Sequence, residues 1–380
     1  MLKLIRRVVI VVLVIYLALF GLTKAIRYPE PIATIKLGLA PASKTPDLMP
    51  FHWIVAAPST FAPWKNGKPE VVGDVTYDGK KISFDEFLKE TKTNAFIIVR
   101  DGKITFEGYY NGKTNKTILP SYSVAKTMTS LLIGQLIDEG KLRESDTFVS
   151  LLPEFKANSS FDKVTIKDLL DMNSGIGVSD NYPSGPAGWG VAIAQMYAST
   201  DSNWWLMNNR KMREEPGTFA EYRSVNTLML GLVIQRLTGN DLAMEMTNRI
   251  WQPMGADFDA TWNVDKLNGH EKAFCCFNAI ARDYARVGQA LMTGNPKIAS
   301  SAWLKRLSTP VVTLDYGWGY SAQMWHPYPG INLMLGLHGQ YVYQDPANKT
   351  VIVKLSDLPT SADGISPKIT DVLKAISEKN

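Results

Sequence analysis

The chain has few of the residues that build metal or disulfide sites. Its only two cysteines, Cys275 and Cys276, are adjacent in 380 residues. Neighbouring cysteines seldom bond to each other, because the small ring strains the peptide between them, and two thiols cannot supply a four-ligand zinc site. We therefore expect a free-thiol pair in an apolar stretch, no disulfide framework, no metal and no cofactor. The four histidines are also scattered: His52, His270, His326 and His338.

Several functional signatures are absent as well. No Gly-x-Ser-x-Gly elbow occurs, which disfavours an α/β-hydrolase. There is no His-Glu-x-x-His motif and no glycine-rich phosphate loop. The net charge is +5, yet no run of lysine and arginine concentrates it, so we expect no nucleic-acid partner. The chain is 45% hydrophobic, which is typical of a globular protein with a substantial core.

The N-terminus carries a clear targeting pattern. Lys3, Arg6 and Arg7 precede an uncharged, mostly apolar run over residues 8–23. A basic flank followed by such a run predicts export with the N-terminus left inside. Because no convincing small-x-small cleavage site follows, we expect residues 1–25 to be an uncleaved inner-membrane anchor, with the rest of the chain facing the periplasm. A cleaved signal peptide, with secretion to the periplasm, is the alternative.

Residues 26–75 contain eight prolines, a density that blocks long helices and sheet ladders, so we expect a linker that wraps the main domain. Residues 76–380 form the predicted domain. A strand-turn-strand pattern over 95–109 starts it, helical patterns follow, and a strand meander over 318–355 precedes a last helix over 366–377. This order predicts an α+β fold, with an antiparallel β-sheet built from both ends of the domain, flanked by helices, and a mostly helical insertion.

A serine and a lysine three residues apart open the most apolar predicted helix, over 121–139. Ser123 and Lys126 lie on one face of such a helix. Burial can lower the pKa of a lysine until its amine takes the proton of a serine nucleophile. A polar helix start with a surface lysine is the alternative from this motif alone. Ser160 and Lys163 have the same spacing, but in a polar loop where the lysine would stay charged.

Two further segments carry candidate polar groups. Tyr222 and Ser224 follow a turn and precede a strong helix, and a tyrosine hydroxyl can relay a proton to a leaving group. Between two predicted strands stand His338, Gly339 and Gln340. A glycine there lets a ligand approach the strand edge, and the following N–H can serve an oxyanion hole. A plain hairpin turn is the alternative for this segment.

Taken in order, these segments resemble the serine β-lactamase and penicillin-binding-protein-like superfamily over most of residues 80–375. The stretch 123–126 resembles its nucleophile motif, and the stretch 216–222 leads into its tyrosine motif. The segment that begins at Asn278 resembles a later helix of the family, and Asn278 is a candidate substrate-binding residue. The resemblance implies that Ser123 is the nucleophile, that Lys126 is the base, and that Tyr222 protonates the leaving group.

The departures from this pattern concern the substrate. Ser224 stands where class C β-lactamases have an asparagine, and Leu337-His338-Gly339 stands in place of their Lys-Thr-Gly. The pattern is more similar to the 6-aminohexanoate-dimer hydrolase and esterase branch, in which a loop tyrosine closes over the substrate. Tyr182 resembles that tyrosine, and a loop aromatic packed on the surface is the alternative.

The sequence therefore predicts a serine hydrolase that acts on a small ester or amide through an acyl-enzyme. The N–H groups of Ser123 and Gln340 are expected to hold the oxyanion, with no cofactor. Two alternatives stay open. One is a true β-lactamase or D-alanyl-D-alanine carboxypeptidase, and the other is a catalytically silent, membrane-tethered binding protein.

Overall fold

The main sheet is built from both ends of the domain, as the sequence predicts. The computed structural model describes residues 1–56, 63–180, 191–359 and 365–379. Within them, nine strands follow the order β10-β11-β12-β13-β14-β15-β5-β6-β2, antiparallel except for the parallel β2–β6 pair. The strands are β2 (Lys65–Asn66), β5 (Thr93–Arg100), β6 (Lys103–Tyr109), β10 (Val312–Thr313), β11 (Gly319–Ser321), β12 (Met324–His326), β13 (Asn332–Gly336), β14 (Gln340–Asp345) and β15 (Thr350–Ser356).

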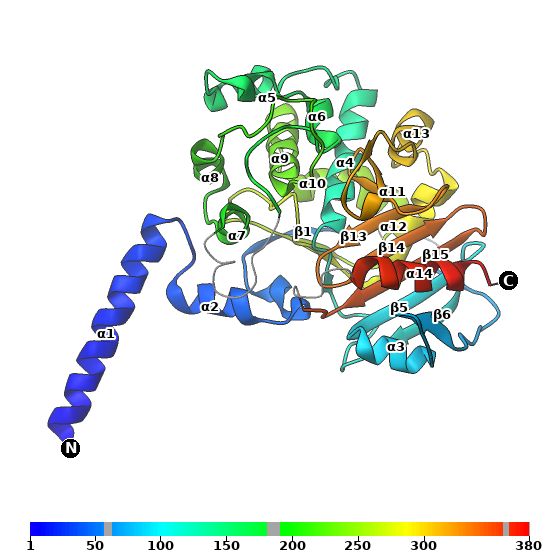
Figure 1. Cartoon of the computed structure of the whole chain (residues 1–380), viewed down its shortest axis with the longest axis horizontal. Coiled ribbons are helices and arrows are strands. Elements are labelled where there is room, and N and C mark those ends of the chain that lie inside the picture. The colour runs from blue at the N-terminus through cyan, green and yellow to red at the C-terminus, as the bar shows by residue number, and fades with distance from the viewer. Residues whose placement is uncertain (57–62, 181–190, 360–364, 380) are drawn as a thin grey trace.

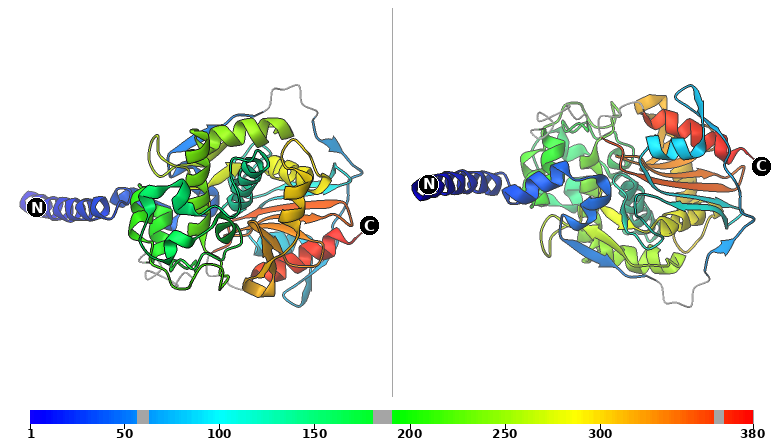
Figure 2. Two further views of the ribbon diagram at one scale, coloured as in Figure 1. Left: turned by 90° about the horizontal axis from the view of Figure 1, so that it is seen from above. Right: turned by 90° about the horizontal axis from the view of Figure 1, so that it is seen from below.

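Both faces of this sheet are buried. Along β5, Ile97 packs into one hydrophobic core and Ile98 into the other, because successive side chains point to opposite faces. The helices α12 and α14 cover the two faces, as the views in Figure 2 show. Gly288 of α12 lets this helix approach the sheet closely, since a Cβ there would lie 2.8 Å from a methyl carbon of Val351.

The helical insertion lies between β6 and β10 in the sequence and beside the sheet in space (Figure 1). Its central helices, α4 and α9, are buried on nearly all sides and contact each other, as their continuous apolar sequences predict. The helices of the domain are α3 (Phe84–Glu90), α4 (Val124–Asp138), α5 (Phe148–Leu151), α6 (Ile166–Leu170), α7 (Ala192–Ala198), α8 (Ser202–Asn208), α9 (Ser224–Thr238), α10 (Leu242–Met246), α11 (Gln252–Met254), α12 (Ala281–Thr293), α13 (Ser301–Ser308) and α14 (Ile365–Ser377).

A second sheet, in the order β1-β8-β9-β7, was not evident from the sequence. Its strands are β1 (Phe51–Ile54), β7 (Leu119–Pro120), β8 (Ala260–Asn263) and β9 (Phe277–Ala279). The strand β7 leads into the turn before α4, so this sheet fixes the start of that helix.

The proline-rich segment 26–75 is more than the predicted linker. It contains the helix α2 (Pro31–Leu39) and the strand β1, which pairs with β8. Pro31 begins α2, where a missing N–H costs nothing. The strand β1 thus belongs to the folded body, although it precedes residue 76, near which the sequence places the start of the main domain. The hairpin of β3 (Val75–Tyr77) and β4 (Lys80–Ile82) follows.

The helix α1 (Leu2–Ala25) projects away from the rest of the chain (Figure 1). It is 24 residues long and contains an 18-residue stretch with a mean hydropathy of 2.5, so it is long and apolar enough to cross a membrane. A signal sequence near the N-terminus has the same properties.

Candidate active site

The structure brings Ser123 and Lys126 together at the start of α4. Ser123 is the N-cap of this helix and is partly exposed, whereas only 1% of Lys126 is exposed. The Nζ of Lys126 lies 2.9 Å from the Oγ of Ser123. Tyr122, just before the serine, has a φ of 44°, an uncommon conformation for a bulky residue that functional turns often hold. The turn thus presents the hydroxyl to solvent with the amine beneath it.

The environment of Lys126 favours its neutral form. Burial lowers the pKa of Lys126 to about 8 from its ordinary 10.5, while the nearby carboxylate of Asp180 acts in the opposite direction. Its Nζ also donates a hydrogen bond to the carbonyl oxygen of Phe274, at 2.9 Å. Because a carbonyl can only accept, this bond directs one N–H away from Ser123. The lone pair of the neutral amine is then available to the serine hydroxyl.

Tyr222 lies on the other side of the lysine. The Nζ of Lys126 is 4.9 Å from the centre of the Tyr222 ring, and Tyr222 is partly exposed. Its ring stacks on Trp325 at 5.2 Å and meets Tyr320 edge-on at 6.1 Å. These two aromatic contacts hold the tyrosine beside the amine, so three predicted residues form one cluster.

Ser224 does not stand alone, because it is bound to a carboxylate that the sequence analysis missed. Asp180 accepts hydrogen bonds from the N–H and the hydroxyl of Ser224. Burial of this carboxylate raises the pKa of Asp180, and the charge of Lys126 lowers it. Asp180 stands in a loop without helical or strand periodicity, so no local pattern marked it. Tyr182, two residues later, lies outside the described residues.

The turn between β13 and β14 meets Ser123 through a different glycine from the predicted one. A Cβ on Gly336 would lie 3.2 Å from the backbone nitrogen of Ser123, whereas a Cβ on Gly339 would meet Leu358 at 2.8 Å. Gly336 is therefore the close-approach position at the serine. Leu337 directly follows Gly336 in the chain.

His338 and Gln340 have structural roles in this turn. The Nδ1 of His338 donates to the carbonyl of Leu358, and burial lowers the pKa of His338. The side chain of Gln340 donates to the carbonyl of Ser356 and accepts from its N–H. These bonds brace the turn against the segment that follows β15.

Asn278 is buried in the second sheet rather than beside Ser123. Its Nδ2 donates to the side chain of Asn263 at 2.9 Å and to the carbonyl of Cys276 at 3.0 Å. It therefore supports the segment before β9, which also binds Lys126 through Phe274. Its predicted place among the substrate-binding residues stays a prediction.

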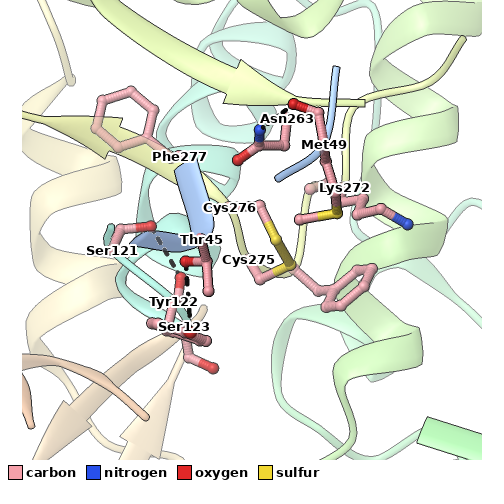
Figure 3. Close-up of a disulfide and its surroundings, with 12 residues drawn as sticks. Thr45, Met49, Ser121, Tyr122, Ser123, Asn263, Lys272, Cys275, Cys276 and Phe277 are labelled. Atoms are coloured by element: carbon pink, nitrogen blue, oxygen red, sulfur yellow. Dashed lines mark hydrogen bonds between the residues drawn. A yellow bond between two sulfur atoms is a disulfide. The ribbon is translucent and has the colours of Figure 1, made fainter. Parts of the chain in front are cut away.

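The prediction of two free thiols is wrong. Cys275 and Cys276 form a disulfide with each other. Figure 3 shows this disulfide in the region between Asn263 and the turn that carries Ser123. The strain argument against such a bond considered the two residues alone. In the folded chain, hydrogen bonds from Asn263 and Asn278 to the Cys276 carbonyl hold the backbone in the required conformation.

Among the described residues, the grouping most like a metal site is His52, Asp241 and Glu271. The Nδ1 of His52 already bonds a carboxylate oxygen of Glu271 at 2.7 Å, and this contact raises the pKa of His52. We interpret the group as an ion pair.

Comparisons with known proteins identify the family of the chain. The sequence model of the Beta-lactamase family matches residues 84–374, which is most of the chain. The chain belongs to the β-lactamase family. Structural relatives share the α+β architecture seen here, and the relatives below include hydrolases.

Relatives of this β-lactamase-family chain include the 6-aminohexanoate-dimer hydrolase of Paenarthrobacter ureafaciens. It is 29% identical over 301 residues, which cover 72% of this chain and 75% of the relative. A Bacillus anthracis protein assigned as a 6-aminohexanoate-dimer hydrolase has a solved structure with a TM-score of 0.78 and 25% identity, covering 92% of this chain and 94% of the other. The hydrolase EstCE1, at 17% identity with a TM-score of 0.61, shares the fold over 77% of this chain and 96% of its own.

Proposed function

We propose that this β-lactamase-family chain is a serine hydrolase that cleaves an ester or amide bond through an acyl-enzyme on Ser123. The observation that carries the proposal is the 2.9 Å contact between the Ser123 hydroxyl and the buried amine of Lys126. With its pKa lowered to about 8, Lys126 has a populated neutral form at mildly alkaline pH. A neutral amine at this distance is a suitable general base for a serine nucleophile.

Each proton has a carrier in this arrangement. As Ser123 Oγ bonds to the substrate carbonyl carbon, its proton passes to Lys126. Tyr222, whose ring faces the amine, then protonates the leaving alcohol or amine as the scissile bond breaks, and recovers a proton from Lys126. Water next attacks the acyl-enzyme with its proton taken by the same groups, which releases the acid and restores the Ser123 hydroxyl.

Backbone N–H groups are the proposed partners of the oxyanion. Ser123 supplies one, as the sequence predicts. For the second we favour Leu337 over the predicted Gln340, because Gly336 lies against the serine nitrogen and Leu337 directly follows it. Donors of this kind stabilise the charge that develops on the substrate oxygen in the transition state.

The charges around the site support a neutral acyl donor. Asp180 interacts electrostatically with Lys126 and with Asp315, and burial raises the pKa values of both carboxyl groups. His338 has a lowered pKa and is mostly neutral at pH 7. The carboxylate of a β-lactam would therefore meet no lysine in this turn. The name of the Paenarthrobacter relative states the hydrolysis of a 6-aminohexanoate dimer, a linear amide.

Location is the second part of the proposal. The helix α1 is long and apolar enough to span a bilayer, and basic residues precede its apolar stretch. We propose that it anchors the chain in the inner membrane, with the catalytic domain on the periplasmic side.

A serine-directed fluorophosphonate probe tests the proposed function. The wild-type chain should be labelled and should hydrolyse p-nitrophenyl butyrate, and Ser123→Ala should lose both properties, with a fall in kcat of about 10⁴-fold or more. Ser160→Ala is the matched control. Lys163 beside it is largely exposed and pairs with Glu215, so this variant should behave as wild type.

Two results would contradict the proposal in different ways. Absence of both labelling and turnover in the folded wild-type chain would favour the catalytically silent binding protein. A penicillin adduct on Ser123 with efficient turnover of nitrocefin would instead restore the true β-lactamase or carboxypeptidase.

A further inference from the structure

The segment before β9 is attached to α4 at two successive carbonyls. Thr129 donates a hydrogen bond to the carbonyl of Ala273 at 3.0 Å, and Lys126 donates to the carbonyl of Phe274 at 2.9 Å. The donors are three residues apart and share one face of the helix. This segment therefore supplies the group that orients the amine of the proposed base.

A carbonyl in a loop keeps its direction only if the neighbouring peptides are fixed. Immediately after Phe274, the disulfide closes a small ring around the peptide between Cys275 and Cys276, and both residues are about 95% buried. Cys276 has a φ of 69°, which a residue with a side chain rarely adopts without support.

The carbonyls of the ring are also fixed. Trp262 donates its indole N–H to the carbonyl of Cys275 at 3.0 Å. The N–H of Asn263 and the side chain of Asn278 both donate to the carbonyl of Cys276. Covalent and hydrogen bonds thus hold the peptides on the C-terminal side of Phe274 in one arrangement. Figure 3 shows the ring beside Asn263 and Lys272.

We propose that the Cys275–Cys276 disulfide is a positioning element of the active site, which holds the Phe274 carbonyl where it directs the Lys126 amine toward Ser123. The inference rests on the proposed serine mechanism and assigns to the cysteines a role that the fold alone does not require. It also makes the hydrolase dependent on the oxidation state of this pair.

Opening the ring should alter the base in a specific direction. The main cause of the lowered pKa of Lys126 is burial. A loosened segment admits water to the amine, which reduces that effect, so the pKa of Lys126 should rise. The neutral base then appears only at higher pH, and the acidic limb of the kcat/KM profile should move upward. A disulfide that only stabilises the fold would lower Tm without moving this limb.

Reduction offers the direct test on the native sequence. A dithiol such as dithiothreitol attacks one sulfur, displaces the other, and then closes its own disulfide. Two electrons and two protons are transferred, and both cysteines become thiols. Because these are the only cysteines in the chain, thiol titration and intact mass report on this bond alone. The full chain in detergent is assayed before reduction, after it, and after reoxidation.

We expect the reduced chain to lose about tenfold to a hundredfold in kcat, the scale typical of a misplaced catalytic group, with KM nearly unchanged. Its acidic limb should move to higher pH, and reoxidation should restore both properties. If the native bond resists the dithiol, the variant Cys275→Ser/Cys276→Ser carries the same expectation. If that variant does not fold, the native chain is reduced in dilute urea and assayed after the urea is removed. We expect the same loss of kcat and the same shift of the acidic limb.

The control is Thr129→Val, which removes the neighbouring attachment of the same segment and leaves the ring intact. It should lower Tm and move the acidic limb less than reduction does, because the ring still fixes the peptides that follow Phe274. An unchanged limb and kcat in the reduced chain would overturn the inference, as would equal shifts in the reduced chain and in Thr129→Val. Ser123→Ala is measured in parallel to distinguish failure of the disulfide inference from failure of the serine mechanism. Activity retained in this variant would refute the serine mechanism itself.

Discussion

Asp180 is joined to Ser224 by two hydrogen bonds, at 2.7 Å from the backbone N–H and at 2.5 Å from the hydroxyl. Ser224 begins α9, so the carboxylate lies at the N-terminal end of this helix, where negative charge is favourable. The same carboxylate interacts with the charge of Lys126. Asp180 thus links the start of α9, two residues after Tyr222, to the proposed base.

The pH dependence of the proposed reaction follows from Lys126. Its pKa is lowered to about 8, and only the neutral amine can accept the serine proton. We expect kcat/KM for a neutral ester to rise with pH through a limb near pH 8. A profile that is flat from pH 6 to 10, with substrate whose own hydrolysis is subtracted, would exclude this lysine as the base.

Replacement of Lys126 by arginine distinguishes a role as general base from a role as a positive charge alone. Lys126→Arg keeps the positive charge but cannot deprotonate near neutral pH. We expect a fall in kcat of about 10²–10⁴-fold, the usual contribution of a general base, and the same loss in Lys126→Ala. Measurement of kcat and Tm for both variants checks this. Substantial activity in Lys126→Arg would show that the residue supplies only charge.

Asp180→Asn should move the acidic limb in the direction opposite to reduction of the disulfide. The carboxylate raises the pKa of Lys126, so its neutralisation should lower that pKa and extend activity to lower pH. The asparagine oxygen can still accept a hydrogen bond from Ser224, so folding should be retained. The kcat/KM profile of the variant, measured beside wild type, decides the matter, and an upward shift would contradict the assigned electrostatics.

Substrate preference should reflect the absence of a lysine from the turn between β13 and β14. A lysine-to-carboxylate hydrogen bond contributes about 1.5–3 kcal/mol, or roughly tenfold to a hundredfold in affinity, and this turn has Leu337 and a neutral His338 instead. We expect p-nitrophenyl butyrate and short linear amides to exceed penicillins and cephalosporins in kcat/KM. A kcat/KM for nitrocefin a hundredfold above that for the ester would contradict this preference and favour a true β-lactamase.

Retention of the N-terminus is the last expectation. If α1 is an anchor, the expressed chain should sediment with membranes, resist extraction by high salt, and keep its first 25 residues by mass spectrometry. Detergent should release it. A soluble mature protein that starts near residue 25 would establish a cleaved signal peptide.

The parts of the fold that the sequence predicts are those with local patterns. The β5–β6 hairpin turns at Asp101-Gly102, and α14 has a regular apolar stripe, so both were expected close to their observed bounds. The pair Ser123 and Lys126 was found because helical spacing places both side chains on one face. Resemblance to the family strengthened that assignment beyond what the motif itself supports.

The missed features depend on contacts between distant segments. The pairing of Phe51 with Asn263 has no local signal, so the second sheet was not expected. Asp180 is significant only because Ser224 and Lys126 meet it in space. The approach of Gly336 to Ser123 was not expected, because the pattern at Gly339 indicates a turn but not which strand end reaches the serine. The disulfide was excluded by a local strain argument that left out its neighbours.

The attachment of the N-terminal segment has a consequence for biosynthesis. Ser43 donates two hydrogen bonds to Asp357, a residue 314 positions later in the chain. At about 5–20 residues per second, the ribosome needs roughly 15–60 s to make that partner after Ser43 has emerged. On the proposed route, the export machinery meets α1 long before the domain can close around the segment behind it. The translocating chain must then stay open at this seam until Asp357 has been made.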